Sequence, residues 1–308
     1  MGKNTDSAKD RETMNIIEAE GVSYVYPVLS DDDPENPGAA QVKKDAEKAL
    51  DGVSLSVRPG QFICILGRNG SGKSTFARQL NAILAPTEGT LWVDGMDSKD
   101  ESKIMEIRRK VGMVFQNPDN QIIGSIVDEE VAFGLENLGA TVTEIRKGVY
   151  EALDDVGMRE YAKASPNRLS GGQKQRIAVA GVLAMQPKCI VLDESTAMLD
   201  PKGRREVMDT VKKLNKEQGI TILSITHYME EALDADYVFV MEKGRLKMQG
   251  TPKEIFSREE EIEQLGLKLP QLCELAKALR EAGMNIPKET ITEEELFAAI
   301  TACSRKEA

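Results

Sequence analysis

Residues 67–74 read Gly-Arg-Asn-Gly-Ser-Gly-Lys-Ser, which is the spacing of a phosphate-binding loop, Gly-x-x-x-x-Gly-Lys-Ser. The run before it, residues 61–66, is apolar, as a buried strand is. Four apolar residues after it recur with helical spacing up to Pro86: Phe76, Leu80, Ile83 and Leu84. Strand, glycine-rich loop and helix is the context that a true phosphate loop requires. This stretch therefore predicts an α/β fold with a nucleotide site at the end of a strand.

The composition narrows the class of partner. The chain has 308 residues, of which 41% are hydrophobic, and its formal net charge is −11. Such a charge repels phosphate backbones, so direct binding to nucleic acid is disfavoured. No apolar run approaches the roughly 18–20 residues that span a bilayer, and the first residues do not resemble a signal peptide. We therefore expect any association with a membrane to depend on partner proteins.

The cysteines predict no metal site and no disulfide. The four thiols are far apart in the sequence, and no Cys-x-x-Cys or Cys/His cluster accompanies them: Cys64, Cys189, Cys273 and Cys303. We expect small buried side chains in a reducing compartment.

Strand-like and helical stretches alternate along the chain. Five apolar runs have the length and character of strands buried on both faces: 61–66, 111–115, 189–192, 220–225 and 236–241. Helical patterns fill residues 117–175, and the polar stretch 28–48, with its acidic segment 31–38, is predicted to be a mobile surface insert. Beyond residue 250, capping-box patterns begin at Thr251, Ser257 and Thr292. The predicted division is a tail over 1–14, a nucleotide-binding domain over 15–250 and a small C-terminal helical extension over 251–308.

Two acids follow the apolar run at 189–192. A carboxylate at the tip of a buried strand is costly to desolvate unless a cation lies beside it, which suits Asp193 to Mg²⁺. Glu194 suits a general base that polarises the attacking water. In the phosphate loop, Lys73 would reach the β- and γ-phosphates and the Ser74 hydroxyl would ligate Mg²⁺. Taken alone, however, an acidic pair after a strand is often only a helix cap.

Residues 169–173 read Leu-Ser-Gly-Gly-Gln, with Ser170 placed to cap a helix and two glycines that permit close approach to a phosphate. Combined with the loop at 67–74, this motif resembles the nucleotide-binding subunits of ABC (ATP-binding cassette) proteins. The resemblance implies an ABC-type P-loop NTPase with a mixed core sheet, an antiparallel N-terminal sheet and a helical subdomain. It also implies that Leu169, Ser170, Gly171, Gly172 and Gln173 face ATP held by the opposite subunit of a dimer.

The same resemblance assigns further roles. His227, the single histidine, would be the switch histidine that contacts the γ-phosphate, and Gln116 would sense Mg²⁺ and couple the site to a membrane partner. Asp200 would lie in a loop at the dimer interface, and Tyr26, or alternatively Tyr24, would stack on adenine. The remaining ATP contacts come from the phosphate loop: Gly67, Asn69, Gly70, Ser71, Gly72, Lys73, Ser74 and Thr75. The implied ligands of Mg²⁺ are Ser74, Gln116 and Asp193.

Two stretches narrow the resemblance. The segments Gln116-Asn-Pro-Asp-Asn-Gln121 and Ile126-Val-Asp-Glu-Glu-Val-Ala-Phe-Gly134 are similar to the ATPases of energy-coupling factor (ECF) transporters and of their cobalt and nickel relatives. So is Leu265-Gly-Leu-Lys-Leu-Pro270. With methionine at position 198, the chain resembles the first of the two paralogous ECF ATPases, because the second usually has glycine at this position. The resemblance implies catalysis by Glu194, His227 and Gln116.

The ECF resemblance also implies partners and a location. They are a second, paralogous ATPase, a transmembrane coupling protein and a small membrane protein that binds the vitamin or metal ion. The chain would then lie on the cytoplasmic face of a bacterial membrane, and the cargo would be recognised by another subunit. Three alternatives stay open: the ATPase of a homodimeric cobalt or nickel importer, a soluble ABC ATPase of DNA repair or translation, and a regulatory cassette that does not hydrolyse ATP.

Overall fold

The computed structural model describes residues 15–29, 40–41 and 47–304. The predicted tail at 1–14 and the acidic segment 31–38 lie outside the described residues. Of the predicted insert, the described parts include β2 (Val28–Leu29) and β3 (Ala40–Gln41), which pair as antiparallel strands. Within these described ranges, no helix combines the length and the apolar character that crossing a membrane requires.

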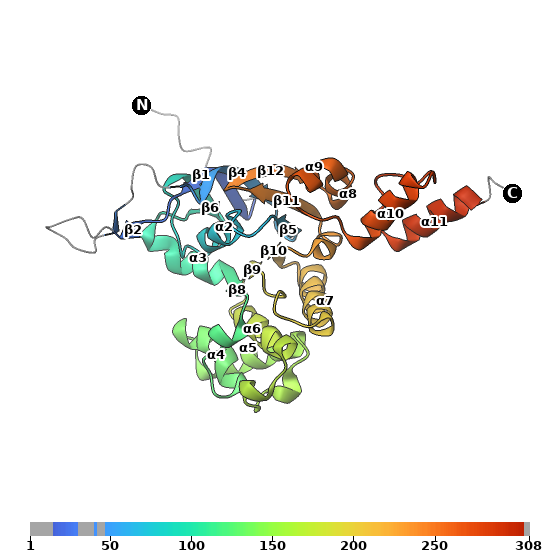
Figure 1. Ribbon diagram of the computed structural model, residues 1–308. Helices are drawn as coiled ribbons and strands as arrows, with labels where there is room; N and C mark the ends of the chain where they lie inside the picture. Colours follow the sequence, from blue (N-terminus) through green and yellow to red (C-terminus); the bar gives the residue numbers. More distant parts are fainter. Residues whose placement is uncertain (1–14, 30–39, 42–46, 305–308) are drawn as a thin grey trace.

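A six-stranded sheet forms the centre of the molecule (Figure 1). Neighbouring strands are parallel except for the last, which pairs with its neighbour as an antiparallel strand. In spatial order the strands are β8 (Val111–Val114), β9 (Cys189–Asp193), β10 (Thr221–Ile225), β5 (Phe62–Leu66), β11 (Tyr237–Glu242) and β12 (Arg245–Gly250). All five predicted strand runs are therefore confirmed. Since β8, β9, β10 and β5 are buried along their whole length, their residues are mostly apolar on both faces rather than apolar at alternate positions.

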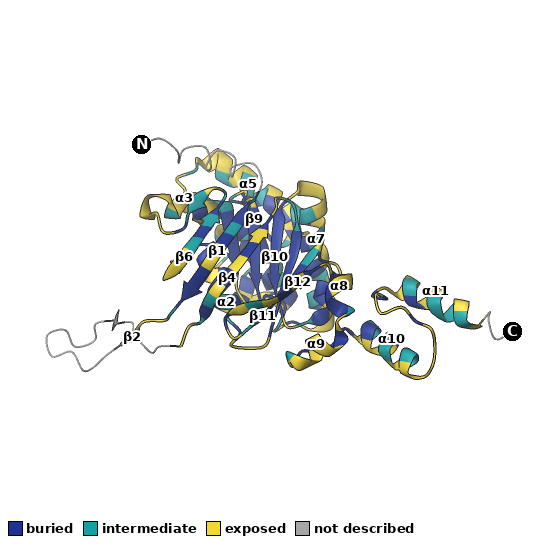
Figure 2. Ribbon diagram, turned by 90° about the horizontal axis from the view of Figure 1, so that it is seen from above, coloured by how far each residue is buried: buried dark blue, intermediate teal, exposed yellow. Residues whose placement is uncertain are grey.

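A second, antiparallel sheet covers the helix that follows the phosphate loop. Its strands are β4 (Leu50–Val57), β1 (Ile17–Tyr24), β6 (Glu88–Val93) and β7 (Met96–Asp97). Figure 2 shows that β4 alternates between buried and exposed residues, whereas β9 and β10 are buried throughout. This alternation is expected for a sheet with one face on the core and one on solvent. Its inner face packs on Phe76 and Leu80.

That helix, α2 (Lys73–Leu80), is shorter than predicted. The apolar spacing predicted a helix that continued through Ile83 and Leu84. Instead the chain turns at Ala82, whose φ is 50°, and the N–H groups of Ile83 and Leu84 both donate to the Arg78 carbonyl oxygen. This left-handed residue ends the helix, as glycine often does at such a position, and leaves the Ile83 side chain exposed. Periodicity alone does not reveal such an ending.

Helices gather into two further groups. The lower lobe of Figure 1 contains α4 (Val127–Asn137), α5 (Val142–Asp155) and α6 (Gly171–Leu183), and α6 connects this lobe to α7 (Pro201–Gln218) and β8. A short helix, α3 (Ile104–Lys110), precedes β8. The C-terminal helices lie at the opposite end of the sheet, and α10 and α11 project away from it. They are α8 (Pro252–Phe256), α9 (Glu259–Gln264), α10 (Gln271–Glu281) and α11 (Glu293–Ser304).

Two of the three predicted capping boxes beyond residue 250 are confirmed. Thr251 caps α8, and the Thr292 hydroxyl accepts a hydrogen bond from the Glu295 N–H at 3.2 Å before α11. The prediction for Ser257 is wrong, because Ser257 ends α8 and its hydroxyl donates to the Glu254 carbonyl oxygen. Arg258 then precedes α9 and pairs with Glu261. A residue that closes one helix is not free to cap the next one.

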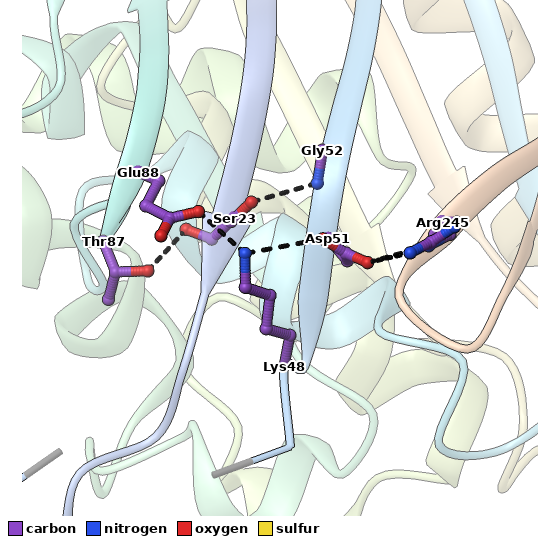
Figure 3. A network of polar contacts seen from close by, with 7 residues as sticks. All are labelled: Ser23, Lys48, Asp51, Gly52, Thr87, Glu88 and Arg245. Atoms are coloured by element: carbon purple, nitrogen blue, oxygen red, sulfur yellow. Dashed lines mark hydrogen bonds and ion pairs between the residues drawn. The ribbon is translucent and has the colours of Figure 1, made fainter. Parts of the chain in front are cut away.

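A polar network joins the edge of the N-terminal sheet to β12 (Figure 3). The Lys48 ammonium bonds the Glu88 carboxylate at 2.8 Å and lies 3.5 Å from Asp51, which in turn pairs with Arg245 of β12. Hydrogen bonds lower the pKa of Asp51, chiefly through Arg245, and raise the pKa of Lys48, chiefly through Glu88. These groups are exposed, so each pair adds little stability. Together they link β4, β6 and β12 beside the entrance to the cleft described below.

The first part of the C-terminal region shares a core with the central sheet. Phe256 and Ile262 are buried against Cys64 and Leu66 of β5, the strand that leads into the phosphate loop. In contrast, the Phe297 side chain on α11 is 73% exposed. We expect Phe256→Ala to lower the free energy of unfolding by about 3–5 kcal/mol, since it opens a cavity in this core. Phe297→Ala should change it by less than about 0.5 kcal/mol.

Urea titrations followed by circular dichroism test this expectation. The two variants remove the same aromatic group from sites that differ in burial, so each serves as the control for the other. Equal unfolding midpoints for the two would contradict a shared core.

Candidate active site

The loop between β5 and α2 requires glycine at its last position. Gly72 has φ 100° and directly precedes α2, and a Cβ atom there would lie 2.5 Å from the Ala49 carbonyl oxygen. Only glycine fits both demands. The Lys73 ammonium folds back and donates to the carbonyl oxygens of Gly67 at 2.8 Å and Arg68 at 3.1 Å. The first N–H groups of a helix have no partner within it, so those at the start of α2 can bind an anion.

A cleft of about 700 Å³ opens in front of this loop. It contains most of the site residues that the sequence predicts: Tyr26, Asn69, Gly70, Ser71, Gly72, Lys73, Ser74, Thr75, Gln116, Asp193 and Glu194. The residues come from the segment after β1, the phosphate loop, the first turn of α2, the end of β9 and the turns that follow β8 and β9. The ends of parallel strands and the start of a helix thus meet in one depression, as in other nucleotide-binding α/β proteins.

Ser74 and Asp193 are suited to a divalent cation. The Ser74 hydroxyl donates to an Asp193 carboxylate oxygen at 2.7 Å, and Asp193 is buried. Burial, aided by the neighbouring charge of Glu194, raises the pKa of Asp193. Among the described residues no cluster of three His, Cys, Asp or Glu side chains could hold a metal alone. Two oxygen donors beside a phosphate site fit Mg²⁺, which completes its shell with substrate oxygens and water.

Glu194 lies between the phosphate loop and His227. Its carboxylate oxygens are 3.7 Å from the Lys73 ammonium and 3.5 Å from Nδ1 of His227. Its backbone has φ 49°, and its N–H donates to the Ile225 carbonyl oxygen at 2.9 Å, which joins the ends of β9 and β10. A left-handed conformation is unusual for glutamate and is tolerated where the surroundings determine it. It holds the carboxylate at the rim of the cleft.

The ammonium of Lys73 is desolvated. Its side chain is almost fully buried, and burial lowers the pKa of Lys73, while Glu194 and Asp193 partly counteract this shift. A cation in such a place gains from an anion that enters the cleft. The local electrostatics therefore favour a phosphate at this point.

Of the two tyrosines considered for stacking on adenine, only Tyr26 lines the cleft. The Tyr26 hydroxyl lies 3.1 Å from the Thr75 hydroxyl, and its half-exposed ring lines the cleft. Tyr24 is buried, and its ring packs edge-on against Tyr26 at 4.9 Å between centroids. Of the two candidates for stacking on a base, the geometry favours Tyr26, because only its ring is accessible from the cleft.

His227 does not line the cleft. It approaches the cleft through Glu194 and lines a smaller cavity of about 350 Å³, together with Gly67 and Arg68. None of the predicted trans-acting residues 169–173 lines the cleft either. Ser170 and Gln173 form a reciprocal capping box at the start of α6, and Asp200 caps α7. A Cβ atom on Gly172 would lie 2.9 Å from the Cα atom of Gly203, so the two helices meet closely there.

Several cleft residues were missed by the sequence analysis. Ala49, Arg78, Phe115, Asn117 and Asn120 also line it. The position of Arg78 in the cleft could have been predicted, because Arg78 follows Ser74 by four residues and so lies on the same face of α2. Asn117 and Asn120 stood inside a quoted motif, but nothing local to that motif reveals that they face the cleft.

Comparisons with known proteins identify the family. A family model described as "ABC transporter" matches residues 50–197. The chain is also 56% identical over 287 residues to the energy-coupling factor transporter ATP-binding protein EcfA1 of Clostridium perfringens (strain 13 / Type A), with 93% of this chain and 98% of the relative covered. The chain belongs to the ATP-binding subunits of energy-coupling factor transporters. The corresponding protein of Clostridioides difficile (strain 630) is 55% identical over 283 residues, with 92% and 97% covered.

Solved structures agree with this ECF assignment. CbiO1 from Clostridium perfringens, described as part of the ABC transporter complex cbiONQ, has a TM-score of 0.70 and 38% identity, with 86% of this chain and 99% of that one covered. A dimeric ATP-binding cassette, MJ0796, bound to ADP and Pi in a post-hydrolysis state, has a TM-score of 0.65 and 30% identity, with 77% and 98% covered. The expected ABC-type fold and the ECF resemblance are thus confirmed.

Proposed function

We propose that this ECF ATPase hydrolyses ATP in its cleft and thereby drives import of a vitamin or a transition-metal ion through membrane partners. One observation carries the proposal: the phosphate loop, the Ser74–Asp193 pair and Glu194 line one cleft, and His227 contacts Glu194 from beside it. The names of the relatives and the cbiONQ complex of the CbiO1 structure support the coupling to transport.

In this proposal each residue acts at a defined place. The N–H groups of the phosphate loop and the Lys73 ammonium bind the phosphates. Ser74, Asp193 and Gln116 would hold Mg²⁺, which neutralises phosphate charge when it is bound. Glu194 accepts a hydrogen bond from the attacking water and orients it toward the γ-phosphate, and His227 contacts the γ-phosphate. The Tyr26 ring stacks on adenine.

Dimerisation completes the site. Residues 169–173 lie outside the chain's own cleft, and Ser170 starts α6 with two glycines behind it. A helix start with accessible N–H groups binds phosphate readily. We infer that this helix start faces the nucleotide of a second subunit, and that Asp200 lies at the same interface. The dimeric MJ0796 structure supports this arrangement. The second subunit would be a paralogous ATPase.

A second depression, of about 550 Å³, is suited to the coupling protein. It lies between α3, β8, α4 and α6 and is rimmed by exposed apolar side chains, among them Met105, Phe115 and Phe133. Large exposed apolar groups that cluster in this way are typical of protein interfaces. Phe115 and the adjacent Gln116 belong to the nucleotide cleft as well. The coupling protein would thus be linked to the nucleotide through the turn after β8 and would hold residues 15–250 at the cytoplasmic face of the membrane.

A pull-down from solubilised membranes of the native host tests the proposal. We expect the tagged chain to recover a second ATPase of similar size and a polytopic membrane protein, with small membrane subunits that reveal the cargo. Phe133→Glu places a charge in the depression and should reduce recovery of the membrane proteins by at least about tenfold while ATP binding persists. The matched control is Phe297→Glu, because Phe297 is exposed on α11, far from this depression.

The outcomes separate the alternatives. A membrane protein recovered without a second ATPase would favour the homodimeric cobalt or nickel importer. Recovery from the soluble fraction alone would contradict a role in transport. Equal recovery by the two glutamate variants would contradict the assignment of the depression.

A further inference from the structure

A buried glutamate outside the predicted site connects its two catalytic segments. Glu231 lies in η5 (Met229–Ala232), the short turn that follows His227, and is only 7% exposed. Its carboxylate accepts a hydrogen bond of 2.6 Å from the Thr196 hydroxyl, two residues after Glu194. Glu231 itself follows His227 by four residues in the chain. One hydrogen bond thus ties the loop after Glu194 to the turn after His227.

The surroundings of this contact are buried and hydrogen-bonded. Thr196 and Thr226 are both buried, and the Thr226 hydroxyl also accepts a hydrogen bond from the Tyr228 N–H at 3.0 Å. The Tyr228 hydroxyl donates to the Ala197 carbonyl oxygen at 3.4 Å, and the Arg204 guanidinium of α7 lies 3.4 Å from the centre of its ring. A second bridge therefore runs beside the first, from the same turn to the same loop.

Burying a carboxylate is unfavourable unless hydrogen bonds compensate for the lost water. Burial raises the pKa of Glu231, and the hydroxyls of Thr196 and Thr226 and the charge of Arg204 act in the opposite direction. An apolar residue would fill this space without that cost. The site keeps a carboxylate that is hydrogen-bonded to Thr196, two residues after Glu194, which indicates a role in geometry rather than in packing.

We propose that Glu231 is a positioning residue of the ATPase reaction, which sets the distance between Glu194 and His227 through its hydrogen bond to Thr196. Glu194 sits at the end of β9 and His227 follows the end of β10, so a shift of either loop would change their 3.5 Å separation. The loop from Glu194 to Asp200 also contains Met198, whose side chain is exposed. If a second subunit contacts this loop and shifts it, the hydrogen bond between Thr196 and Glu231 would transmit the shift to Glu194 and His227. This inference rests on the proposed roles of Glu194 and His227.

Single substitutions test the bond. In the full-length chain within its purified complex, we expect Thr196→Val to lower kcat about 10- to 100-fold while the KM for ATP stays within about twofold, because a displacement of catalytic groups by a fraction of an ångström costs rate rather than binding. Thr196→Ser keeps the hydroxyl and should restore kcat to within about threefold of the parent. Glu231→Gln should lower kcat in the same direction. The control is Glu230→Gln, since Glu230 is the exposed neighbour in the same turn.

A double variant separates positioning from stability. Glu231→Met with Thr196→Val removes both polar partners, so it should recover the melting temperature that Thr196→Val alone loses. If Glu231 positions the site, kcat stays low in the double variant although the fold is stable again. Recovery of kcat together with the melting temperature would overturn the proposal, and so would equal kcat values for Thr196→Val and Thr196→Ser. Failure of the proposed function is distinguishable, because Glu194→Gln would then retain turnover.

Discussion

Glu194→Gln is expected to lower the kcat for ATP hydrolysis by at least about 100-fold, the range that removal of a general base produces. The amide keeps the size of the side chain but cannot accept a proton from water. Its effect on binding should be small or favourable, because Glu194 lies 3.7 Å from Lys73 and its negative charge opposes an incoming phosphate. We therefore expect a protein that binds ATP at least as tightly as the parent and remains in the closed, dimeric state.

The matched comparison is Asp193→Asn, which alters the adjacent residue. Asp193 accepts the hydrogen bond from Ser74, so its replacement should weaken Mg²⁺-dependent binding as well as turnover. Steady-state hydrolysis and fluorescent-nucleotide titration with and without Mg²⁺ distinguish the two variants. Normal turnover by Glu194→Gln would exclude Glu194 as the base.

The parts of this site that could be predicted from sequence are those that the chain encodes locally. The phosphate loop is a contiguous motif between a buried strand and a helix, and Asp193 and Glu194 end another buried strand. Because the carboxyl ends of parallel strands meet at one edge of a sheet, residues distant in the chain come together there. This is why Gln116 and Asp193 line the same cleft.

The features that the sequence did not reveal depend on tertiary contacts or on single backbone angles. The end of α2 is set by one left-handed alanine, Ala82, which no periodicity predicts. Ser257 matched a capping box, but the preceding helix already used it. Glu231 resembles any other acid in a polar run, and its burial against Thr196 arises only when β9 and β10 pair. Pattern analysis finds the groups that touch the substrate more easily than the groups that hold them.

Lys73→Ala is expected to weaken ATP binding by about 100-fold, because it removes the cation that the cleft presents to the phosphates. In the protein without nucleotide, the Lys73 ammonium is buried and its pKa is lowered by that burial, although Glu194 lies nearby. The free protein therefore bears an unfavourable desolvation energy at this position that a bound phosphate compensates. The Lys73→Ala variant should therefore lose most of its affinity for ATP, whereas the stability of the nucleotide-free protein should fall by less.

Thermal unfolding with and without Mg²⁺-ATP tests both halves of this argument. A ligand stabilises a protein by RT ln(1 + [L]/Kd), so at 100 times the Kd the parent should gain about 2.7 kcal/mol, and a 100-fold weaker variant should gain only about 0.4 kcal/mol. Lys110→Ala is a suitable control, since Lys110 pairs with Asp94 away from the cleft. If Lys73→Ala melts like the parent without nucleotide and gains almost nothing from it, the ammonium acts mainly on the bound phosphates. If the variant unfolds at a much lower temperature without nucleotide, the hydrogen bonds from Lys73 to Gly67 and Arg68 outweigh desolvation, and the lysine builds the loop as much as it binds the ligand.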